Sequence, residues 1–202
     1  MTLTVWLSLV VICCFGAISP GPSLAVVLRH TVVNGRLHGI FTAISHAAGV
    51  GLWALLTIWG LALLVTESPF IYQIITWAGA AYLAWMGWKA IRSTGGSRLN
   101  LNATKAPLMN AARDGLMISL LNPKLAVFFL ALFSQFISAE QTLTDQMIML
   151  ATVAGIDGLW YCIVAVVLSH SGILDKLQQR SALIDKISGA IFILLAVRVV
   201  TL

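Results

Sequence analysis

Charged residues are scarce in this sequence, and their scarcity excludes an ordinary water-soluble domain. Asp, Glu, Lys and Arg make up 9% of the 202 residues, and hydrophobic residues make up 59%. A soluble domain is about one quarter charged. Residues 1–28, 40–66 and 68–88 carry no charged side chain, and each run is long enough for the ~20 residues that a bilayer crossing needs. We therefore expect an all-α integral membrane protein.

Three further segments are apolar but contain a few charges, and each is also long enough to span a bilayer. Together with the charge-free runs they predict six transmembrane helices. The longest polar stretch is too short to fold alone, so we interpret residues 93–108 as a cytoplasmic linker between two halves, 1–92 and 109–202. The three further segments are 115–139, interrupted by Lys124, 146–174, interrupted by Asp157, and 183–202.

Cysteine is also rare, and several motifs of soluble enzymes and pumps are missing. The odd count of three cysteines, two of them adjacent in the chain, argues against a disulfide framework. No G-x-x-x-x-G-K-[ST] loop occurs, which argues against direct use of ATP. The first apolar run has no basic segment before it and no small-residue cleavage site, so we expect it to be retained. We predict no cofactor, and no metal site either, because Cys, His and carboxylate ligands are too few at mid-depth.

The basic residues that are present indicate how the chain is threaded. The net charge is +5, but Lys and Arg lie mostly in short loops between expected spans, so they indicate orientation rather than nucleic-acid binding. The loops around residues 67–69 and 137–145 contain none. By the positive-inside rule the basic loops lie in the cytoplasm and both termini lie outside it. The basic loop residues are Arg29, Arg36, Lys89, Arg92, Arg98, Lys105, Arg113, Lys176, Arg180 and Lys186.

Short matches between the two halves predict an internal repeat. Because each half contains three expected spans, the second half enters the membrane from the opposite side. This is the inverted-repeat plan of secondary transporters, in which a broken helix in each half frames a site near the midplane. The matching segments are 22–28 with 123–129, 51–53 with 158–160, and 79–80 with 189–190.

Prolines interrupt one expected helix in each half. Pro20 and Pro22 flank Gly21 in the first span, and Pro123 follows Asn122 in the fourth. Proline lacks an N–H group and breaks the helical hydrogen-bond pattern. We therefore predict that helices 1 and 4 are broken, and that the two breaks face each other halfway through the membrane.

A new half-helix begins beyond each break, and its first N–H groups carry partial positive charge. Ser19 and Asn122 are residue types that cap such ends, Ser23 supplies one of the amides, and Lys124 adds a full positive charge. An anionic group, such as a carboxylate, would fit between the two ends.

Two further side chains at mid-depth are candidates for a functional role. A charge at the bilayer centre costs ~2.5–3.5 kcal/mol, so Asp157 is expected to face the interior and mark a pathway. Its partner is left open: a substrate ammonium, a coupling proton, or Lys124 in a static ion pair between two helices. His46 either relays protons, because histidine exchanges them near neutral pH, or is hydrogen-bonded to a neighbouring helix.

Taken together, these motifs resemble the lysine-exporter (LysE/RhtB) superfamily of small amino-acid exporters, over the whole length of the chain. The matching residues are SPGP at 19–22, NPK at 122–124, Asp157 followed three positions on by Trp160, GAAYLAWMGWKAIR at 79–92, and LLNPKLAVFFLALFSQF at 120–136.

The resemblance implies a multi-pass exporter in the bacterial inner membrane, with both termini periplasmic, driven by the proton gradient and often homo-oligomeric. Family members differ in cargo, which includes basic, hydroxylated and other neutral amino acids and, in distant branches, metal ions. Carried over by motif, the family's functional positions correspond to Pro20, Gly21, Pro22, Asn122, Pro123, Lys124 and Asp157.

Our leading hypothesis is a non-enzymatic antiporter for a small amino acid, with threonine, homoserine or leucine favoured. The half-helix ends and Lys124 would hold its carboxylate, and Asp157 would hold its ammonium. Protonation of Asp157 from outside would then displace the substrate, with His46 as a second candidate for proton coupling.

The alternatives are an exporter of basic amino acids or of a metal ion, an intramembrane enzyme, and a non-catalytic membrane subunit. The enzyme would use His46 with Asp157, or Ser45 as a nucleophile. Ser45 and His46 are adjacent in the sequence and would point to different faces of one helix, which argues against direct contact between nucleophile and base.

Overall fold

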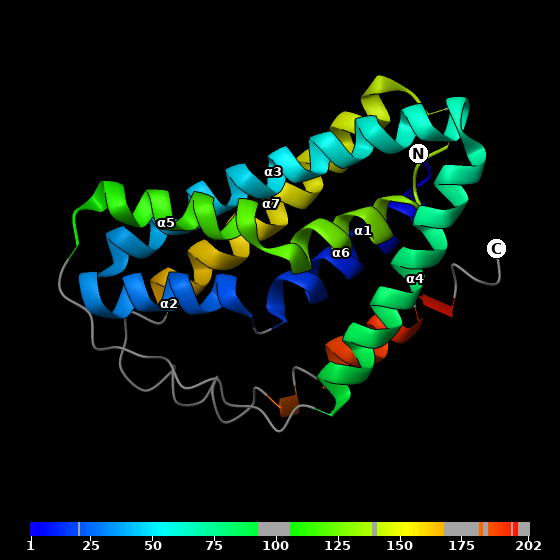
Figure 1. The fold of residues 1–202 in the computed structure, drawn as a ribbon. Helices are drawn as coiled ribbons and strands as arrows, with labels where there is room; N and C mark the ends of the chain where they lie inside the picture. The colour runs from blue at the N-terminus through cyan, green and yellow to red at the C-terminus, as the bar shows by residue number, and fades with distance from the viewer. Residues whose placement is uncertain are drawn as a thin grey trace.

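The regular structure of the described chain is entirely helical (Figure 1). The computed structural model describes residues 1–19, 21–92, 106–138, 141–167, 182–183, 186–194 and 196–197. Residues 186–194 also form a helix, which carries no label. The labelled helices are α1 (Leu3–Ile18), α2 (Pro22–Asn34), α3 (Arg36–Glu67), α4 (Pro69–Ile91), α5 (Leu108–Leu121), α6 (Pro123–Phe133) and α7 (Leu143–Val167).

The lengths and compositions of these helices agree with a membrane protein. In the described residues, α3 over Arg36–Leu64 and α7 over Leu143–Val167 are each long and apolar enough to cross a bilayer. Two bent helix pairs bring the candidate spans to four if each pair is one crossing. The all-α prediction is confirmed, whereas the six-span inverted arrangement stays a prediction. Residues 184–185, 195 and 198–202 of the sixth expected span, 183–202, lie outside the described residues.

The bent pairs occur where the prolines predict broken helices. The first pair joins α1 and α2 at an angle of 59°, with Ser19 ending α1 and Gly21 preceding α2. The second joins α5 and α6 at 56°, with Asn122 between them. A proline occupies the first turn of both α2 and α6, where its missing N–H costs nothing. The predicted breaks at 19–22 and 122–123 are therefore confirmed.

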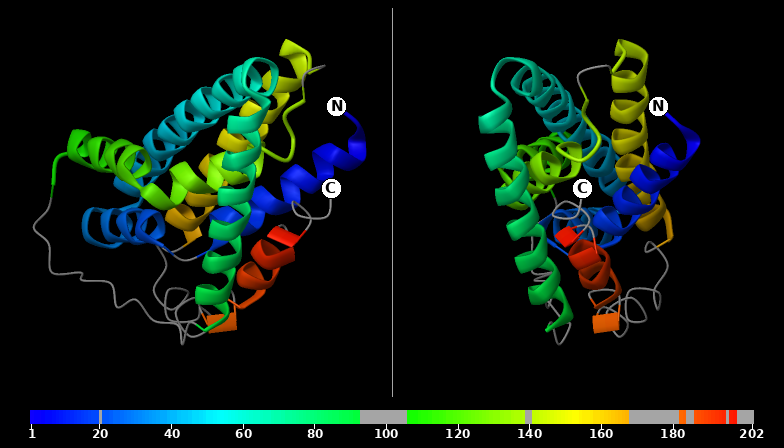
Figure 2. Two further views of the ribbon diagram at one scale, coloured as in Figure 1. Left: turned by 45° about the vertical axis from the view of Figure 1, so that its right-hand side comes forward. Right: turned by 90° about the vertical axis from the view of Figure 1, so that its right-hand side faces the viewer.

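The two bent pairs run in opposite directions and meet at their breaks. In Figure 1 the chain passes from α1 to α2 towards the left, and from α5 to α6 towards the right. The left panel of Figure 2 also places α5 and α6 alongside α2 and α1. The amide Nδ2 of Asn122 lies 3.4 Å from Ser23 Oγ, which joins one break to the other. The division at 93–108 stays a prediction, although α5 already begins at Leu108.

Glycines allow α3 to approach α5 very closely. A Cβ on Gly115 of α5 would collide with the Thr42 carbonyl and the Ser45 hydroxyl of α3. A Cβ on Gly49 of α3 would collide with Ser119 of α5. Small residues serve this purpose in membrane helices, where close van der Waals packing holds helices together. Close packing here fixes the break after α5 relative to α3.

Candidate functional site

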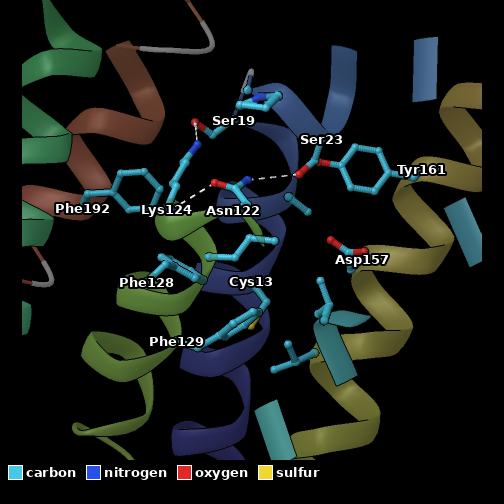
Figure 3. A pocket seen from close by; sticks show the side chains of 17 residues that line it. Cys13, Ser19, Ser23, Asn122, Lys124, Phe128, Phe129, Asp157, Tyr161 and Phe192 are labelled. Carbon is cyan, nitrogen blue, oxygen red and sulfur yellow. Dashed lines mark hydrogen bonds between the residues drawn. The ribbon is translucent and has the colours of Figure 1, made fainter. Parts of the chain in front are cut away.

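A pocket lies where the two breaks meet (Figure 3). Seven of the nine residues predicted to bind a substrate line it, and they come from α2, α6, α7 and the two breaks. Pro20 lies outside the described residues, and Pro123 is the first residue of α6. The seven are Ser19, Gly21, Pro22, Ser23, Asn122, Lys124 and Asp157.

Asn122 caps the second half-helix as the sequence predicts. Its side-chain oxygen Oδ1 accepts a hydrogen bond of 3.0 Å from the backbone N–H of Lys124. Its side-chain nitrogen donates to Ser23 across the break. Since Asn122 is 6% exposed, both halves of its amide are used inside the protein. One residue therefore stabilises the start of α6 and joins it to α2.

Ser19 does not cap the first half-helix, which corrects the sequence prediction. The N-cap position of α2 is Gly21, and no side chain hydrogen-bonds to that end. Ser19 instead ends α1, and its hydroxyl accepts a hydrogen bond of 3.4 Å from Lys124 Nζ. The reason is spacing: Pro22 is the first helical residue, so the capping position belongs to Gly21 rather than Ser19. The α2 end thus presents amides that no side chain caps.

The ammonium of Lys124 lies close to Gly21 at the first break. A Cβ on Gly21 would lie 3.5 Å from Lys124 Nζ, which is contact distance. Figure 3 shows the Lys124 side chain extending from α6 towards Ser19. The positive charge of one half therefore lies beside the helix end of the other half.

Asp157 forms a hydrogen bond with His46 inside the protein. The carboxylate oxygen Oδ2 of Asp157 on α7 lies 2.8 Å from Nδ1 of His46 on α3. Asp157 is 7% exposed and His46 is fully buried. The sequence left open whether His46 contacts a neighbouring helix or exchanges protons with the site. It does contact a neighbouring helix, and the partner is the acid of the pocket.

The surroundings of His46 restrict its hydrogen bonding to this one nitrogen. Nε2 is buried and has no hydrogen-bond partner among the described residues. The ring packs edge-to-face on Tyr161, with centroids 5.0 Å apart, and the Tyr161 hydroxyl lies beside Ser23 (Figure 3). Ser45 donates to the Thr42 carbonyl at 3.1 Å, and it faces α5 at Gly115. The arrangement therefore separates Ser45 from His46, as their adjacency in the sequence predicts.

A tryptophan satisfies the carbonyl that Pro123 leaves without a helical donor. Pro123 cannot donate to Ser119, and the indole Nε1 of Trp53 on α3 lies 3.1 Å from that carbonyl. Trp160 is the counterpart of Trp53 in the sequence repeat. Its indole N–H is buried and has no partner within the described part of the chain. The two matched halves therefore differ in how they support their breaks.

Sequence reasoning missed most of the apolar pocket lining. Tyr161 and Val153 lie four residues from Asp157, and Phe128 lies four residues from Lys124, so helical periodicity would have placed them on the same faces. Phe192 carries no such signal, because it is far from every predicted site residue in the sequence. The missed lining residues are Cys13, Gly16, Ala17, Val50, Leu125, Phe128, Phe129, Val153, Tyr161 and Phe192.

A second polar cluster joins α2 to α5 away from the pocket. The carboxylate oxygen Oδ2 of Asp114 lies 2.6 Å from Arg29 and 2.9 Å from Nε2 of His30. Asn34 contacts the other ring nitrogen of His30 at 3.2 Å and accepts from the Ala106 backbone at 2.8 Å. This cluster links the first half of the chain to the second.

Broken helices whose ends meet at a pocket, with buried ionisable side chains beside it, are features of the class of membrane transporters. Comparison with known proteins agrees with this class. The family model described as LysE type translocator matches residues 14–202, so the chain belongs to that family.

Curated relatives cover most of the chain at modest identity. An uncharacterized membrane protein of Escherichia coli K12 is 26% identical over 90% of this chain and 82% of its own length. The threonine efflux protein of the same strain is 26% identical over 86% of each chain. The homoserine/homoserine lactone efflux protein of Salmonella typhimurium LT2 is 29% identical over 74% of this chain and 73% of its own length. No solved structure matches this chain.

Proposed function

We propose that this protein is a secondary exporter of small amino acids, and that the pocket between the two breaks is its substrate site. The observation that carries the proposal is the position of Asp157, Lys124 and the uncapped end of α2 around one pocket. An amino acid carries one positive and one negative group, and this pocket offers one partner for each. The names of two relatives, which state threonine and homoserine efflux, support the same class of cargo.

The carboxylate of the substrate binds at the cationic side of the pocket. Lys124 Nζ lies near Ser19 and Gly21, next to the N-terminus of α2. A helix N-terminus and an ammonium both attract an anion, and the uncapped amides of α2 can donate to it. Asn122 caps the start of α6 through the backbone N–H of Lys124. This hydrogen bond fixes the backbone position from which the Lys124 side chain extends. Pro20, Gly21, Pro22 and Pro123 contribute by shaping the breaks.

The ammonium of the substrate binds Asp157, and the pair of Asp157 and His46 carries the coupling proton. His46 hydrogen-bonds to Oδ2 of Asp157. We propose that the other carboxylate oxygen, Oδ1, binds the ammonium of the substrate. Protonation of Asp157 removes the negative charge that holds the ammonium, so a proton entering from outside displaces the substrate. Rocking of one inverted half against the other would then open the pocket to alternate sides.

Two replacements of the same kind on α7 test this proposal. Asp157→Asn removes the acid of the pocket, and Asp145→Asn changes an acid near the start of the same helix that is not part of the pocket lining. In liposomes that contain the purified protein, we expect Asp157→Asn to abolish amino-acid transport driven by a pH gradient. Asp145→Asn should transport like the unchanged protein. Unchanged transport by Asp157→Asn would remove this acid from the mechanism.

The six-span inverted plan, the periplasmic termini and the inner-membrane location belong to the same proposal. The repeat matches and the opposite directions of the two bent pairs support the plan. We also propose that the protein forms a homo-oligomer, because α3 and α4 expose large apolar side chains. Among the described residues, no group of three His, Cys, Asp or Glu side chains is placed to hold a metal ion.

A further inference from the structure

The pocket has two chemically different ends (Figure 3). The polar end is formed by Ser19, Ser23, Asn122 and Lys124 at the two breaks. In Figure 3 the side chains of Cys13, Phe128 and Phe129 lie below Lys124 and Asn122, farther from the breaks along α1 and α6. The apolar end consists of six lining residues that also belong to the main hydrophobic core: Cys13, Val50, Phe128, Phe129, Val153 and Phe192.

The apolar end is built by packed aromatic rings. The ring of Phe128 meets Phe129 at 5.4 Å and Phe192 at 5.8 Å between centroids, both edge-to-face. Phe129 in turn stacks on Phe133 at 5.8 Å. Gly16 gives the Phe128 ring its space, since a Cβ there would lie 2.9 Å from the ring. These ring contacts hold the side chains of the apolar end in place.

The apolar end offers almost no hydrogen-bond partner to a substrate. The thiol of Cys13 is the one heteroatom among its six side chains, and a thiol is a weak donor and a weak acceptor. A hydroxyl or ammonium that entered this end would lose its water hydrogen bonds without replacement, which costs free energy. An apolar side chain has no hydrogen bonds to water to lose, and its burial there is favourable in free energy.

We propose, as an extension that rests on the proposed function, that the cargo is a neutral amino acid with an aliphatic or thioether side chain. Its carboxylate binds at the polar end, its ammonium at Asp157, and its side chain enters the apolar end. This narrows the class of substrate to leucine-like and methionine-like amino acids, in contrast to the hydroxylated cargo in the names of two relatives. Apolar pockets reject an added hydroxyl by about 100-fold at most, so threonine is disfavoured rather than excluded.

The test measures transport by the full chain, purified and reconstituted in liposomes, with labelled leucine, methionine, threonine, homoserine and lysine. We expect kcat/KM for leucine and methionine to exceed that for threonine and homoserine by about tenfold or more, and lysine to be transported least. Equal or better transport of threonine or homoserine would overturn the apolar assignment and leave amino-acid export intact. No flux of any amino acid, with the protein still folded, would overturn both.

A matched pair of cysteines tests the apolar end itself. Cys13→Ser places a hydroxyl in the pocket at nearly constant volume, and Cys14→Ser makes the same change at the next residue, which is outside the pocket lining. Cys13→Ser should raise the ratio of threonine to leucine transport severalfold, and Cys14→Ser should leave it unchanged. Val153→Thr, an isosteric change, should act like Cys13→Ser if serine at position 13 unfolds the protein. An unchanged ratio in the variants that fold would overturn the proposal.

Discussion

His46 differs from the other described histidines because it contacts the acid of the pocket. Its Nδ1 lies 2.8 Å from Asp157, whereas His38 on the same helix contacts the Ala106 carbonyl at 3.0 Å. The groups that surround the His46 and Asp157 pair include Tyr161, packed on the ring, and Cys13, which shares the pocket with Asp157. Histidine is the side chain suited to exchanging a proton with such an acid near neutral pH.

Replacing His46 by Asn separates hydrogen bonding from proton exchange. The amide of Asn approximates the position of Nδ1 and can donate to Asp157, but it does not take up a proton near neutral pH. We expect His46→Asn to keep KM for the substrate within a few-fold and to weaken the dependence of transport on pH.

The measurement is the initial transport rate in liposomes as a function of pH. His38→Asn is the matched control, because it changes another histidine of α3 that does not touch the pocket, and it should preserve the pH profile. A His46→Asn protein whose pH profile matched that of the unchanged protein would contradict a role in proton coupling.

The broken helix made of α5 and α6 depends on a partner in α3. Because Pro123 removes the donor for the Ser119 carbonyl, the indole of Trp53 supplies it at 3.1 Å. A buried carbonyl without a partner costs about 1–3 kcal/mol. We expect Trp53→Phe to lower the free energy of unfolding in detergent by about that amount beyond the loss of ring area.

Trp160→Phe is the matched control for this prediction. It removes the same ring atoms at the counterpart position of the repeat, where the indole N–H has no partner in the described chain. Its effect on thermal or denaturant unfolding should therefore be smaller than that of Trp53→Phe. Equal losses for the two variants would show that the Trp53 hydrogen bond contributes little.

The contact between α3 and α5 should tolerate no side chain at Gly115. A methyl group there meets the Thr42 carbonyl and the Ser45 hydroxyl, and backbone at such a contact has little freedom to move. Overpacking of this kind costs about 1–3 kcal/mol, so Gly115→Ala should unfold at lower temperature in detergent. At Gly155 of α7 nothing lies within 4 Å of the added methyl. Gly155→Ala should be neutral or stabilising by about 0.5–1 kcal/mol, and a loss there equal to that at Gly115 would refute the packing explanation.

In the whole molecule, the two halves touch through α2 and α5 as well as through the breaks. Arg29 on α2 and Asp114 on α5 form an ion pair of 2.6 Å, and rocking of the halves requires this contact to separate. With the three native cysteines replaced by alanine, we expect an Arg29→Cys, Asp114→Cys protein to lose transport when a short bis-methanethiosulfonate reagent cross-links its two thiols, and to regain it with a reductant. The reagent spans the gap left by the Arg side chain, which is too long for a direct disulfide. The single variants should not respond to this treatment. Full transport by the cross-linked protein would show that α2 and α5 stay together throughout the cycle.

Local patterns in the sequence determined a large part of this protein. The shortage of charge excluded a soluble fold, and the prolines located the breaks between α1 and α2 and between α5 and α6. The residue type and position of Asn122 predicted its capping role. These features are readable because hydropathy, proline geometry and helix capping each act within a few neighbouring residues. Family membership also follows from the sequence, through the motifs around the breaks.

Only the tertiary structure decided which distant side chains meet. The sequence left open whether Asp157 pairs with a substrate ammonium, a coupling proton or Lys124. The packing of α3 on α7 places His46 in contact with Asp157 across 111 positions. The capping role expected of Ser19 was wrong, since the hydroxyl contacts Lys124 from the other half instead. Phe192 joins the apolar end from a helix that no motif connects to the site. These contacts depend on how each helix is rotated and where it crosses its neighbours, which is set by the close packing of the whole bundle rather than by any short stretch of chain.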